Sequence, residues 1–515
     1  MHVRVFAVLL LFPSSPLNSQ PAQTHLIRFQ QPEPLSFEDL VTLASVDPPP
    51  PELQRRLGAL RSEPFLSNEA AFEGVKPVRP VERGVGPVLR IAEWNINRLD
   101  KETMRDALSN LRAYQGAVRA NPKAGRRLLR SASGEVRDLQ GADIIVFDEI
   151  DDGVPRSGYQ NVPRETAQLL HMNYVYAVEF VELNRLYLAV HKMDIVDPPA
   201  QVRMTAKFGV DANRYLGLEG TALLSRYPII SARIVDLPQE YDWYHGEAGA
   251  ISGLVKAENW SAEKLFEERM TRQVRRGGRI MLVVQLAVPG VPTGTLTVLC
   301  PHLEDYARPA GRREQMDFVL KQAGSISGPV MSAGDLNTLG HDGAPATAKR
   351  LVRGYLLNPK FWLREAFYFV APVPGLSYIF FAVNYLKNFH DPTAPSIPLL
   401  LPNHSKPIFS DIQHFRFQDG ATFNWEGRKR DSYHHKGRTL SDSNERSWKG
   451  FRPTFSFRRT YHGTIGEFKI DWMFVKQLDG LQPRRGKTLC ELNTAVGDRI
   501  SDHCPITVEV PLRER

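Results

Sequence analysis

The stretch GDRISDHCPI (residues 497–506) places an acid and an imidazole side by side just before a β-branched run. Neighbouring residues at the entrance of a strand point to different sides. Asp502 can therefore hold a metal ion while His503 meets a phosphoryl oxygen. Alone, such a pair also fits a loop that makes local hydrogen bonds. Five further segments of the same kind lie upstream, and together they make the pair significant.

Two of these segments are apolar strands that end in ligands for metal or phosphate. The first, LRIAEWNIN (residues 89–97), ends in the amides Asn95 and Asn97, which project to one side of the strand. The second, DIIVFDE (residues 143–149), ends in the carboxylates Asp148 and Glu149. Mg²⁺ prefers hard oxygen ligands of this kind, and ligands commonly bind at the carboxyl ends of strands in α/β sheets.

The other three segments each deliver one or two polar side chains from an apolar strand. LTVLCPH (residues 296–302) ends in His302, which could donate to a phosphoryl oxygen. PVMSAGDLN (residues 329–337) carries Asp335 and Asn337, a carboxylate to orient water and an amide to hold phosphate, after a glycine that allows close backbone approach. Asp471 lies inside an apolar strand and needs a partner, for which His503 is the logical choice.

The composition is that of a large globular protein with a net positive charge. The chain has 515 residues, 42% of them hydrophobic and 24% charged, and a net charge of +8. A basic surface favours acidic partners, which include nucleic acid, anionic lipid head groups and phosphorylated metabolites. Cys300, Cys490 and Cys504 form no C-x-x-C pair, so we expect three buried thiols. One disulfide with one thiol left over is the alternative.

The first 86 residues differ from the rest of the chain. Residues 1–20 have a short basic start, an apolar run and small polar residues, which predicts a signal peptide and a secreted or periplasmic protein. The alternative is a cytoplasmic protein with a disordered start. Residues 21–86 are proline-rich and predict an arm that wraps the folded part, with helices only over Phe37–Ala44 and Pro51–Leu60.

Strand and helix patterns alternate from residue 87 onward, which predicts an α/β layered domain over residues 87–512. The pattern lapses over residues 340–462, which we interpret as an insertion. Within it, Ala366–Leu386 carries no charged residue, and its prolines favour a buried segment or a loop in contact with membrane over a span. Expected strands are Val88–Trp94, Asp143–Phe147, Tyr174–Val178, Ala222–Leu224, Ile280–Val288, Leu296–Pro301, Val330–Ala333, Ile470–Val475 and Ile506–Val510. Expected helices are Glu102–Ala120, Arg164–Leu170 and Gly311–Ala323.

Five of these segments together resemble the endonuclease/exonuclease/phosphatase superfamily: Trp-Asn, Asp-Glu, Gly-Asp-Leu-Asn, Ile-Asp-Trp and Ser-Asp-His-x-Pro. The stretch GTALLSRYP (residues 220–228), and Arg312 with Gln315 after His302, are similar to further stretches common in that family. The resemblance implies a four-layer α/β sandwich, with two facing mixed sheets and helices outside. It also implies a phosphoesterase that uses Mg²⁺, with Mn²⁺ or Ca²⁺ as alternatives.

The resemblance also implies a role for each matched position. Glu149 would be the principal metal ligand, beside Asn95 and Asp502. Asp335 would orient or deprotonate the attacking water. The remaining predictions are as follows: Asn337 holds the phosphate, His503 paired with Asp471 stabilises the transition state, His302 contacts a phosphate oxygen or the leaving group, and Asn97 and Arg312 bind substrate.

Two positions depart from the family pattern. Asp148 stands where many members carry Gln, and Asn97 where the abasic-site enzymes often carry Asp, which weakens assignment to that branch. His302 favours the branches that resemble deoxyribonuclease I and sphingomyelinase. We therefore expect a nuclease-like hydrolase of phosphodiester bonds in DNA or RNA, without an obligate protein partner. A phospholipid or inositol-phosphate esterase, touching membrane through Ala366–Leu386, is the alternative, and a non-catalytic binding protein is the third.

Overall fold

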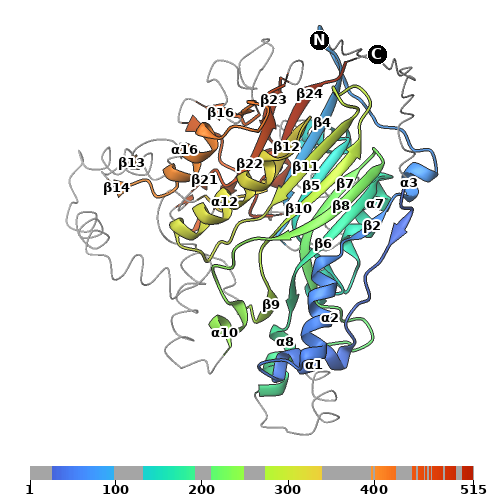
Figure 1. Ribbon diagram of the computed structural model, residues 1–515, viewed down its shortest axis with the longest axis vertical. Helices are drawn as coiled ribbons and strands as arrows, with labels where there is room; N and C mark the ends of the chain where they lie inside the picture. The colour runs from blue at the N-terminus through green and yellow to red at the C-terminus, as the bar shows by residue number, and fades with distance from the viewer. Residues whose placement is uncertain are drawn as a thin grey trace, which may run out of the picture.

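In the computed structural model, two β-sheets pack face to face with helices on their outer surfaces (Figure 1). The structure describes residues 26–97, 132–191, 210–248, 273–338, 396–397, 401–424, 443–447, 450–456, 459–460, 463–464, 467–478, 482–494 and 501–513. The predicted helix Glu102–Ala120 and the uncharged stretch Ala366–Leu386 lie outside these residues. So do residues 1–20, and export remains a prediction.

The larger sheet has ten strands and is mixed, because only β4 and β5 run parallel in it. Its main order is β1-β2-β6-β7-β5-β4-β24-β23, with β3 beside β4 and β9 beside β6. The bounds are β1 (Phe29–Gln30), β2 (Phe65–Ser67), β3 (Val81–Glu82), β4 (Gly86–Asn95), β5 (Ile144–Asp152), β6 (Asn173–Glu182), β7 (Leu218–Ser225), β9 (Arg275–Gly277), β23 (Arg484–Thr488) and β24 (Ile506–Pro511).

The smaller sheet has six strands in the order β15-β22-β12-β11-β10-β8, and only β11 and β12 run parallel. The bounds are β8 (Ile229–Asp236), β10 (Ile280–Ala287), β11 (Thr295–Pro301), β12 (Val330–Asp335), β15 (Phe423–Asn424) and β22 (Asp471–Lys476). Four two-stranded ribbons complete the described strands: β13 (Ser396–Ile397) with β14 (Leu401–Pro402), β16 (Arg446–Ser447) with β17 (Gly450–Phe451), β18 (Phe455–Ser456) with β21 (Glu467–Phe468), and β19 (Arg459–Thr460) with β20 (Gly463–Thr464).

Three apolar layers hold the four structural layers together. The central one lies between the sheets and contains alternate residues of each strand, such as Leu89 and Ile91 of β4 and Val298 of β11. Each of the two outer apolar layers lies between one sheet and the helices that cover it. This arrangement confirms the predicted four-layer sandwich. The helices are α1 (Phe37–Ser45), α2 (Pro51–Ser62), α3 (Glu69–Phe72), η1 (Pro155–Ser157), α7 (Val162–Leu170), α8 (Asn184–His191), α10 (Trp243–Glu247), α12 (Pro309–Gly324), α16 (Lys406–His414) and α17 (Cys490–Thr494), and residues 132–140 are also helical.

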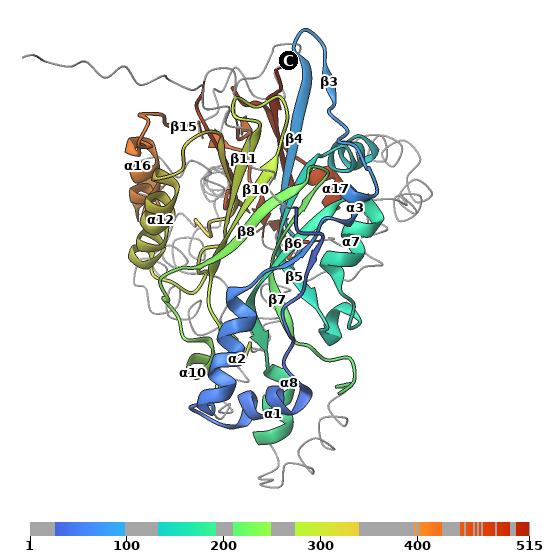
Figure 2. The ribbon, with the colours of Figure 1, turned by 45° about the vertical axis from the view of Figure 1, so that its right-hand side comes forward.

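The proline-rich N-terminal segment is built into the fold (Figure 2). Its strands β1 and β2 extend the ten-stranded sheet at the β6 edge. Its helix α1 starts at a capping box in which Ser36 and Asp39 bond reciprocally, as expected for a stable helix start. Arg61 of α2 donates to the carbonyl oxygen of Glu179 on β6 and forms an ion pair with Asp236 on β8, which ties the segment to both sheets.

Part of the segment predicted as an insertion also belongs to the body. In α16, Ile408, Phe409 and Ile412 are buried in the layer that covers the six-stranded sheet. Arg313 of α12 forms an ion pair with Asp411 of α16, and β15 adds a strand at the sheet edge. Among the described residues, no helix is long and apolar enough to cross a membrane.

The cysteines correct one expectation. Cys490 and Cys504 form a disulfide, with their Cα atoms 4.9 Å apart, and Cys300 is a buried free thiol. The prediction of three thiols was therefore wrong, and the alternative of one disulfide with one thiol left over is observed. The two cysteines are separated by 14 positions, and no spacing motif marks the pair in the sequence.

Candidate active site

The inner faces of both sheets change from apolar to polar toward one end. On β4, the buried positions Leu89 and Ile91 are followed on the same face by Glu93 and Asn95. The same change occurs on the strands that face or neighbour β4, which contribute Asp148, Glu179, Asp335 and Asp471. His302 and His503 follow β11 and precede β24 at this end. All eight of these polar side chains are buried.

Asp335 lies between the two imidazole rings. Its Oδ2 is 3.9 Å from Nε2 of His503 and 4.0 Å from Nε2 of His302. Its Oδ2 also accepts from the side-chain amide of Asn95 at 3.1 Å. Gly334 allows β12 to lie close to the end of β11, because a Cβ at this position would lie 2.1 Å from the carbonyl oxygen of Pro301.

His503 is held from behind by one carboxylate. Its Nδ1 is 2.9 and 3.0 Å from the two oxygens of Asp471, and its backbone accepts from Trp94 Nε1. Burial would lower the pKa of His503, but Asp471 and Asp502 raise it well above its ordinary value. Burial and the charge of Asp471 raise the pKa of Asp335 to about 7. The site thus contains a carboxyl that can exchange a proton near neutral pH.

His302 is held by a larger buried network. Its Nδ1 is 3.1 Å from Oε1 of Glu179 and 2.8 Å from Nη1 of Arg279. Burial acts against the charge of Glu179, yet His302 and Arg279 lower the pKa of Glu179 to about 2. Burial and Arg279 act to lower the pKa of His302, while Glu179 and Asp148 raise it to about 9.

Two β-bulges direct the carboxylates of this network to the site. The register of β5 shifts between Phe147 and Ile150, and that of β6 shifts between Val178 and Phe180. Thr221 of β7 lies between the bulged strands and bonds to Asp148 Oδ1 at 2.8 Å and Glu179 Oε1 at 2.7 Å. Bulges are typical next to active sites, where they change the direction of a side chain.

The sequence profile of the Endonuclease/Exonuclease/phosphatase family matches residues 92–379. The chain belongs to this family. Its members are phosphoester hydrolases, and the two sheets of the structure agree with the α/β sandwich of the family. None of the curated proteins compared matches the sequence.

Several solved structures are similar to this family member. An endonuclease/exonuclease/phosphatase from Beutenbergia cavernae is 14% identical, with 83% of this chain and 72% of that chain covered and a TM-score of 0.36. The human nocturnin catalytic domain with bound sulfate is 10% identical, with coverage of 82% and 94% and a TM-score of 0.36. Truncated Caenorhabditis elegans TDP2 is 12% identical, with coverage of 82% and 97% and a TM-score of 0.32.

The structure gathers most of the predicted catalytic residues of this family member. Asn95, His302, Asp335, Asp471 and His503 meet between the sheets, as described above. Asn337 adjoins them, with its backbone N–H bonded to Asp335 and its side chain to the carbonyl of Leu303. Asp502 is half-buried, with Oδ1 3.8 Å from Nε2 of His503.

Three predicted residues lie in a different setting. Arg312 is 1% exposed and donates to the carbonyl oxygens of Ala307 and Asp305, and the substrate contact expected for it stays a prediction. Asn97 is exposed at the end of β4 and bonds through its N–H to Asn95. Glu149 is half-buried in the β5 bulge with a φ of 54°, and its charge acts on Arg279.

Sequence reasoning missed Glu179, Arg279 and Thr221, although two of them carried a signal. Glu179 is an acid within the apolar run YVYAVEFVE (residues 174–182), the same pattern that singled out Asp471. Thr221 lies in the stretch GTALLSRYP (residues 220–228), which resembles a stretch common in the family, but the resemblance assigned no role to the Thr221 hydroxyl. Nothing in its neighbourhood marked Arg279, which stands in the basic run RRGGR (residues 275–279).

Two more buried ionisable side chains, Glu93 and Lys469, lie near Asp471. Glu93 is fully buried, and neither of its carboxyl oxygens has a hydrogen-bond partner among the described residues. Burial and the charge of Asp471 raise its pKa well above the ordinary value, which favours its neutral form. Burial lowers the pKa of Lys469 to about 8. Both side chains interact electrostatically with Asp471, the partner of His503.

The described residues offer oxygen donors for a divalent cation. Two groups bring potential ligand atoms within 4.8 Å of one another: Asp148, Glu179 and His302 in one group, and Asp335, Asp471 and His503 in the other. Arg279 already supplies a cation to the first group. At the second, Asn95 and Asp502 add hard oxygens, and burial with the charge of Asp471 raises the pKa of Asp335, which a bound cation would offset. The donor set therefore fits the metal that the family implies.

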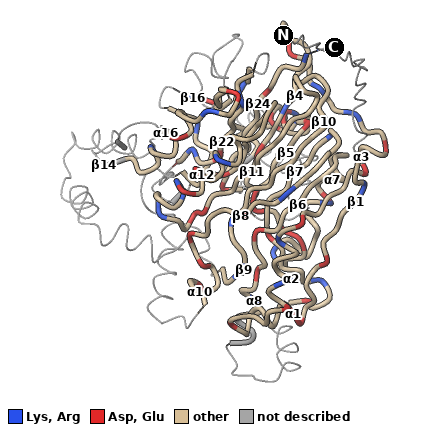
Figure 3. Tube along the Cα trace, viewed as in Figure 1, with Lys and Arg blue, Asp and Glu red and all other residues tan. Residues whose placement is uncertain are grey.

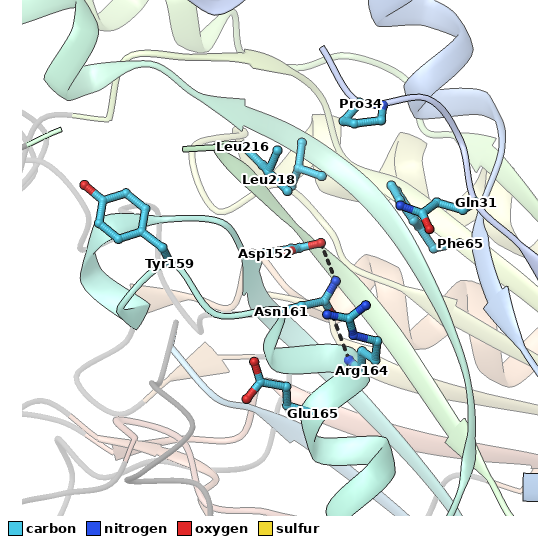
Figure 4. Close-up of a pocket in the computed structure, with 10 residues that line it drawn as sticks. All are labelled: Gln31, Pro34, Phe65, Asp152, Tyr159, Asn161, Arg164, Glu165, Leu216 and Leu218. Carbon is cyan, nitrogen blue, oxygen red and sulfur yellow. Dashed lines mark hydrogen bonds between the residues drawn. The ribbon is translucent and has the colours of Figure 1, made fainter. Parts of the chain in front are cut away.

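The structure also has a cavity of about 280 Å³ on the far side of the ten-stranded sheet (Figure 4). Phe65 and Leu218 in its wall belong to the outer apolar layer, and Gln31 and Pro34 of the N-terminal segment close it. Asp152 lies in it, bonded to Asn161 at 2.6 Å. The cavity contains none of the residues that surround Asp335, so it is separate from the candidate active site.

Proposed function

We propose that this protein hydrolyses phosphodiester bonds by metal-assisted attack of water, with a nucleic acid as substrate. One observation carries the proposal: Nε2 atoms of two histidines flank one carboxylate oxygen of Asp335, at 3.9 and 4.0 Å. Each ring is backed on its other nitrogen by a buried carboxylate, Asp471 or Glu179. Such rings are oriented to meet charge that develops on a phosphoryl group.

In this proposal the two sides of the site share the proton transfers. The oxygen of water forms a bond to phosphorus while its proton passes to Asp335, whose pKa near 7 suits a base at neutral pH. The ester bond opposite the attacking water breaks, and the leaving oxygen takes a proton from one of the two imidazole rings. Asn337 orients the phosphoryl oxygens beside His302 and His503.

A divalent cation would be held by Asn95, Asp502 and Glu149 beside Asp335. When bound, it supplies Lewis-acid stabilisation of the negative charge on the phosphoryl oxygens. Mg²⁺ is the ion we propose from the hard oxygen donors, with Mn²⁺ or Ca²⁺ as alternatives. The buried charges of Asp471, Glu179 and Asp148 orient the rings and remain in place without the ion.

The choice of nucleic acid rests on charge. The chain carries a net charge of +8, and Lys and Arg are interspersed with Asp and Glu along the described chain (Figure 3). Basic balance favours a polyanion. The lipid alternative depends on Ala366–Leu386, which lies outside the described residues. The Cys490–Cys504 disulfide is typical of oxidising compartments, which supports the export that we propose from residues 1–20.

The test is Mg²⁺-dependent hydrolysis of plasmid DNA, measured in parallel with sphingomyelin liposomes and soluble inositol phosphates. We expect nicking of the plasmid, its loss in EDTA and its recovery on adding Mg²⁺. Binding should also weaken steeply with salt, because phosphate contacts release counterions. Asp335→Asn tests the site without changing the shape of the side chain. His245→Asn is the matched control, since His245 is exposed on α10 and its ring bonds, among the described residues, to Asp47 and Asp242 only.

The outcomes separate the alternatives. DNA cleavage that is lost in Asp335→Asn and kept in His245→Asn supports the proposal. Cleavage of liposomes or inositol phosphates with the same dependence on Asp335 would keep the site and replace the substrate. No hydrolysis of any of the three in Mg²⁺, Mn²⁺ or Ca²⁺ would contradict the proposed function.

A further inference from the structure

The cavity on the far side of the ten-stranded sheet combines apolar surface with charged side chains (Figure 4). Its volume is about 280 Å³. Phe65 and Leu218 supply apolar surface, and Asp152, Arg164 and Glu165 supply charges. Pockets that bind small molecules have this character, with apolar contacts and a few polar groups that fix the orientation of the ligand.

Asp152 is the buried charge of this cavity. It is 4% exposed, and Asn161 donates to its Oδ2 at 2.6 Å. Among the described residues, no cation forms an ion pair with it. The neighbouring Asp151 does have such a partner, because Arg156 donates to both of its carboxylate oxygens, and Arg156 also pairs with two further carboxylates. Burial raises the pKa of Asp152 to about 7, so the ionised carboxylate lacks the stabilisation that a cation in direct contact would give.

Arg164 carries the positive charge of the cavity wall. It stands in the first turn of α7, where its backbone N–H bonds to the side chain of the N-cap Asn161 at 2.9 Å. Its guanidinium is exposed and forms no hydrogen bond or ion pair with another described residue. Its charge still acts on Asp152, where it opposes the effect of burial on the pKa. The wall therefore has a carboxylate and a guanidinium that are near each other but not paired.

We propose that this cavity binds a small zwitterion, an amino acid whose ammonium group pairs with Asp152 and whose carboxylate pairs with Arg164. A buried carboxylate is stabilised by a cation in contact with it, and a guanidinium binds a carboxylate through two parallel hydrogen bonds. Glu165 also acts to raise the pKa of Asp152, and a bound ammonium group would relieve this repulsion. The apolar part of the ligand would contact Phe65 and Leu218.

The size and position of the cavity restrict the ligand further. Pockets for drug-sized ligands begin at about 300 Å³, so this volume suits a single amino acid better than a nucleotide. Gln31 and Pro34 of the N-terminal segment form part of the wall, so a bound ligand would also hold that segment against the sheet. None of the residues around Asp335 lines the cavity, and the inference goes beyond the proposed hydrolysis.

The test is binding to the whole protein after removal of metal, measured by isothermal titration calorimetry. L-Leucine and γ-aminobutyrate are the probes, because they separate the ammonium and carboxylate groups by different distances. Each is compared with the same molecule lacking one charged group: isopentylamine and isocaproate for leucine, and propylamine and butyrate for γ-aminobutyrate. We expect at least one amino acid to bind, and its two analogues to bind at least about tenfold more weakly, since each loses a charge-assisted contact. An analogue that binds as tightly as its amino acid, or no binding of either amino acid at millimolar concentration, would overturn the proposal.

Variants show whether the ligand occupies this cavity. Arg164→Gln changes an exposed side chain, which keeps the fold, and should weaken binding at least about tenfold. Asp152→Asn keeps the shape of the side chain and an acceptor for Asn161, and should weaken binding as much. Arg233→Gln is the matched control, since Arg233 is an exposed arginine of β8 outside the cavity.

Two results with these variants would contradict the proposal. One is unchanged binding in Arg164→Gln or in folded Asp152→Asn, and the other is an equal loss in Arg233→Gln. Because the measurement is binding and not turnover, a failure of the proposed hydrolysis would leave this result readable.

Discussion

The two histidines beside Asp335 lie at nearly the same distance from it and are held in different ways. Nδ1 of His503 faces both oxygens of Asp471, whereas Nδ1 of His302 faces a carboxylate and a guanidinium. Asp471 favours the charged form of His503, because it raises the pKa of that ring. Behind His302, Glu179 favours the charged form while Arg279 opposes it. The two rings therefore meet the same carboxylate from different electrostatic surroundings.

The largest effect should follow removal of the groups at the centre of the comparison. We expect Asp335→Asn and His503→Asn to lower the rate of phosphodiester hydrolysis roughly 10²- to 10⁴-fold, because each loses a proton acceptor or the charge that meets the phosphoryl group. Single-turnover rates on DNA measure the loss. Activity within threefold of the wild type in either variant would contradict the placement of the reaction at Asp335.

The same chemical change behind each ring should have unequal effects. In Asp471→Asn, the ring of His503 loses the carboxylate that holds its Nδ1 and raises its pKa, and with it the positive charge that meets the phosphoryl group. We expect a loss on the order of 10³-fold. In Glu179→Gln, Arg279 still contacts Nδ1 of His302 and Asp148 still acts on the ring, so the loss should stay below about tenfold.

The values of kcat and their pH profiles measure this pair of variants. Equal losses in Asp471→Asn and Glu179→Gln would remove the distinction between the two sides. A larger loss in Glu179→Gln would reverse it. Thermal unfolding of both variants is the control, since each change leaves a buried group with an altered partner.

The pH dependence of stability should also mark the His302 side. The pKa of His302 is raised from 6.5 to about 9, so its contribution to stability is full below 6.5 and is lost as the pH rises through about 9. The pKa of Glu179 is lowered from 4.5 to about 2, so its contribution is full above 4.5 and is lost as the pH falls through about 2.

The difference in Tm between the wild type and His302→Gln should therefore be largest near pH 5 to 6.5 and should shrink toward pH 9. Differential scanning fluorimetry in EDTA over this range measures it without interference from metal. A difference that stays constant from pH 5 to pH 9.5 would mean that the charge of His302 does not stabilise the fold.

The smallest effect should come from Thr221, which joins Asp148 to Glu179 behind His302. Thr221→Val keeps the shape and removes the hydroxyl, and we expect it to lower the free energy of unfolding by about 1–3 kcal/mol. Thr221→Ser keeps the hydroxyl and should lie within about 1 kcal/mol of the wild type. Urea unfolding compares them, and equal stability of the Val variant and the wild type would show that the bridge contributes nothing.

Much of the fold could be predicted from periodicity. The predicted strands Val88–Trp94 and Leu296–Pro301 fall within β4 and β11, because long apolar runs bounded by polar residues have few other solutions. The strands β1, β2 and β9 were not predicted. Phe29–Gln30 and Arg275–Gly277 are too short to show a period, and they are strands only because an edge of the sheet offers them hydrogen bonds.

The candidate site shows the same division. Asp335, Asp471, His302 and His503 could be proposed because each ends or interrupts an apolar strand. Arg279 could not be proposed, because a basic residue in RRGGR is ordinarily solvated, and only the fold removes it from water. The disulfide is a similar case, since Cys490 and Cys504 become neighbours only when β23 and β24 pair.

The sequence by itself determined which strands end in polar side chains, since alternation along a strand is a local property of the chain. It also determined the donors and acceptors available at each position. Only the tertiary structure decided which of them face each other across the two sheets. The β5 and β6 bulges set Asp148 and Glu179 on one level, and the turn before β10 brings Arg279 to the same ring. Because the proton positions of a buried imidazole depend on its neighbours in space, the roles of His302 and His503 follow from the fold.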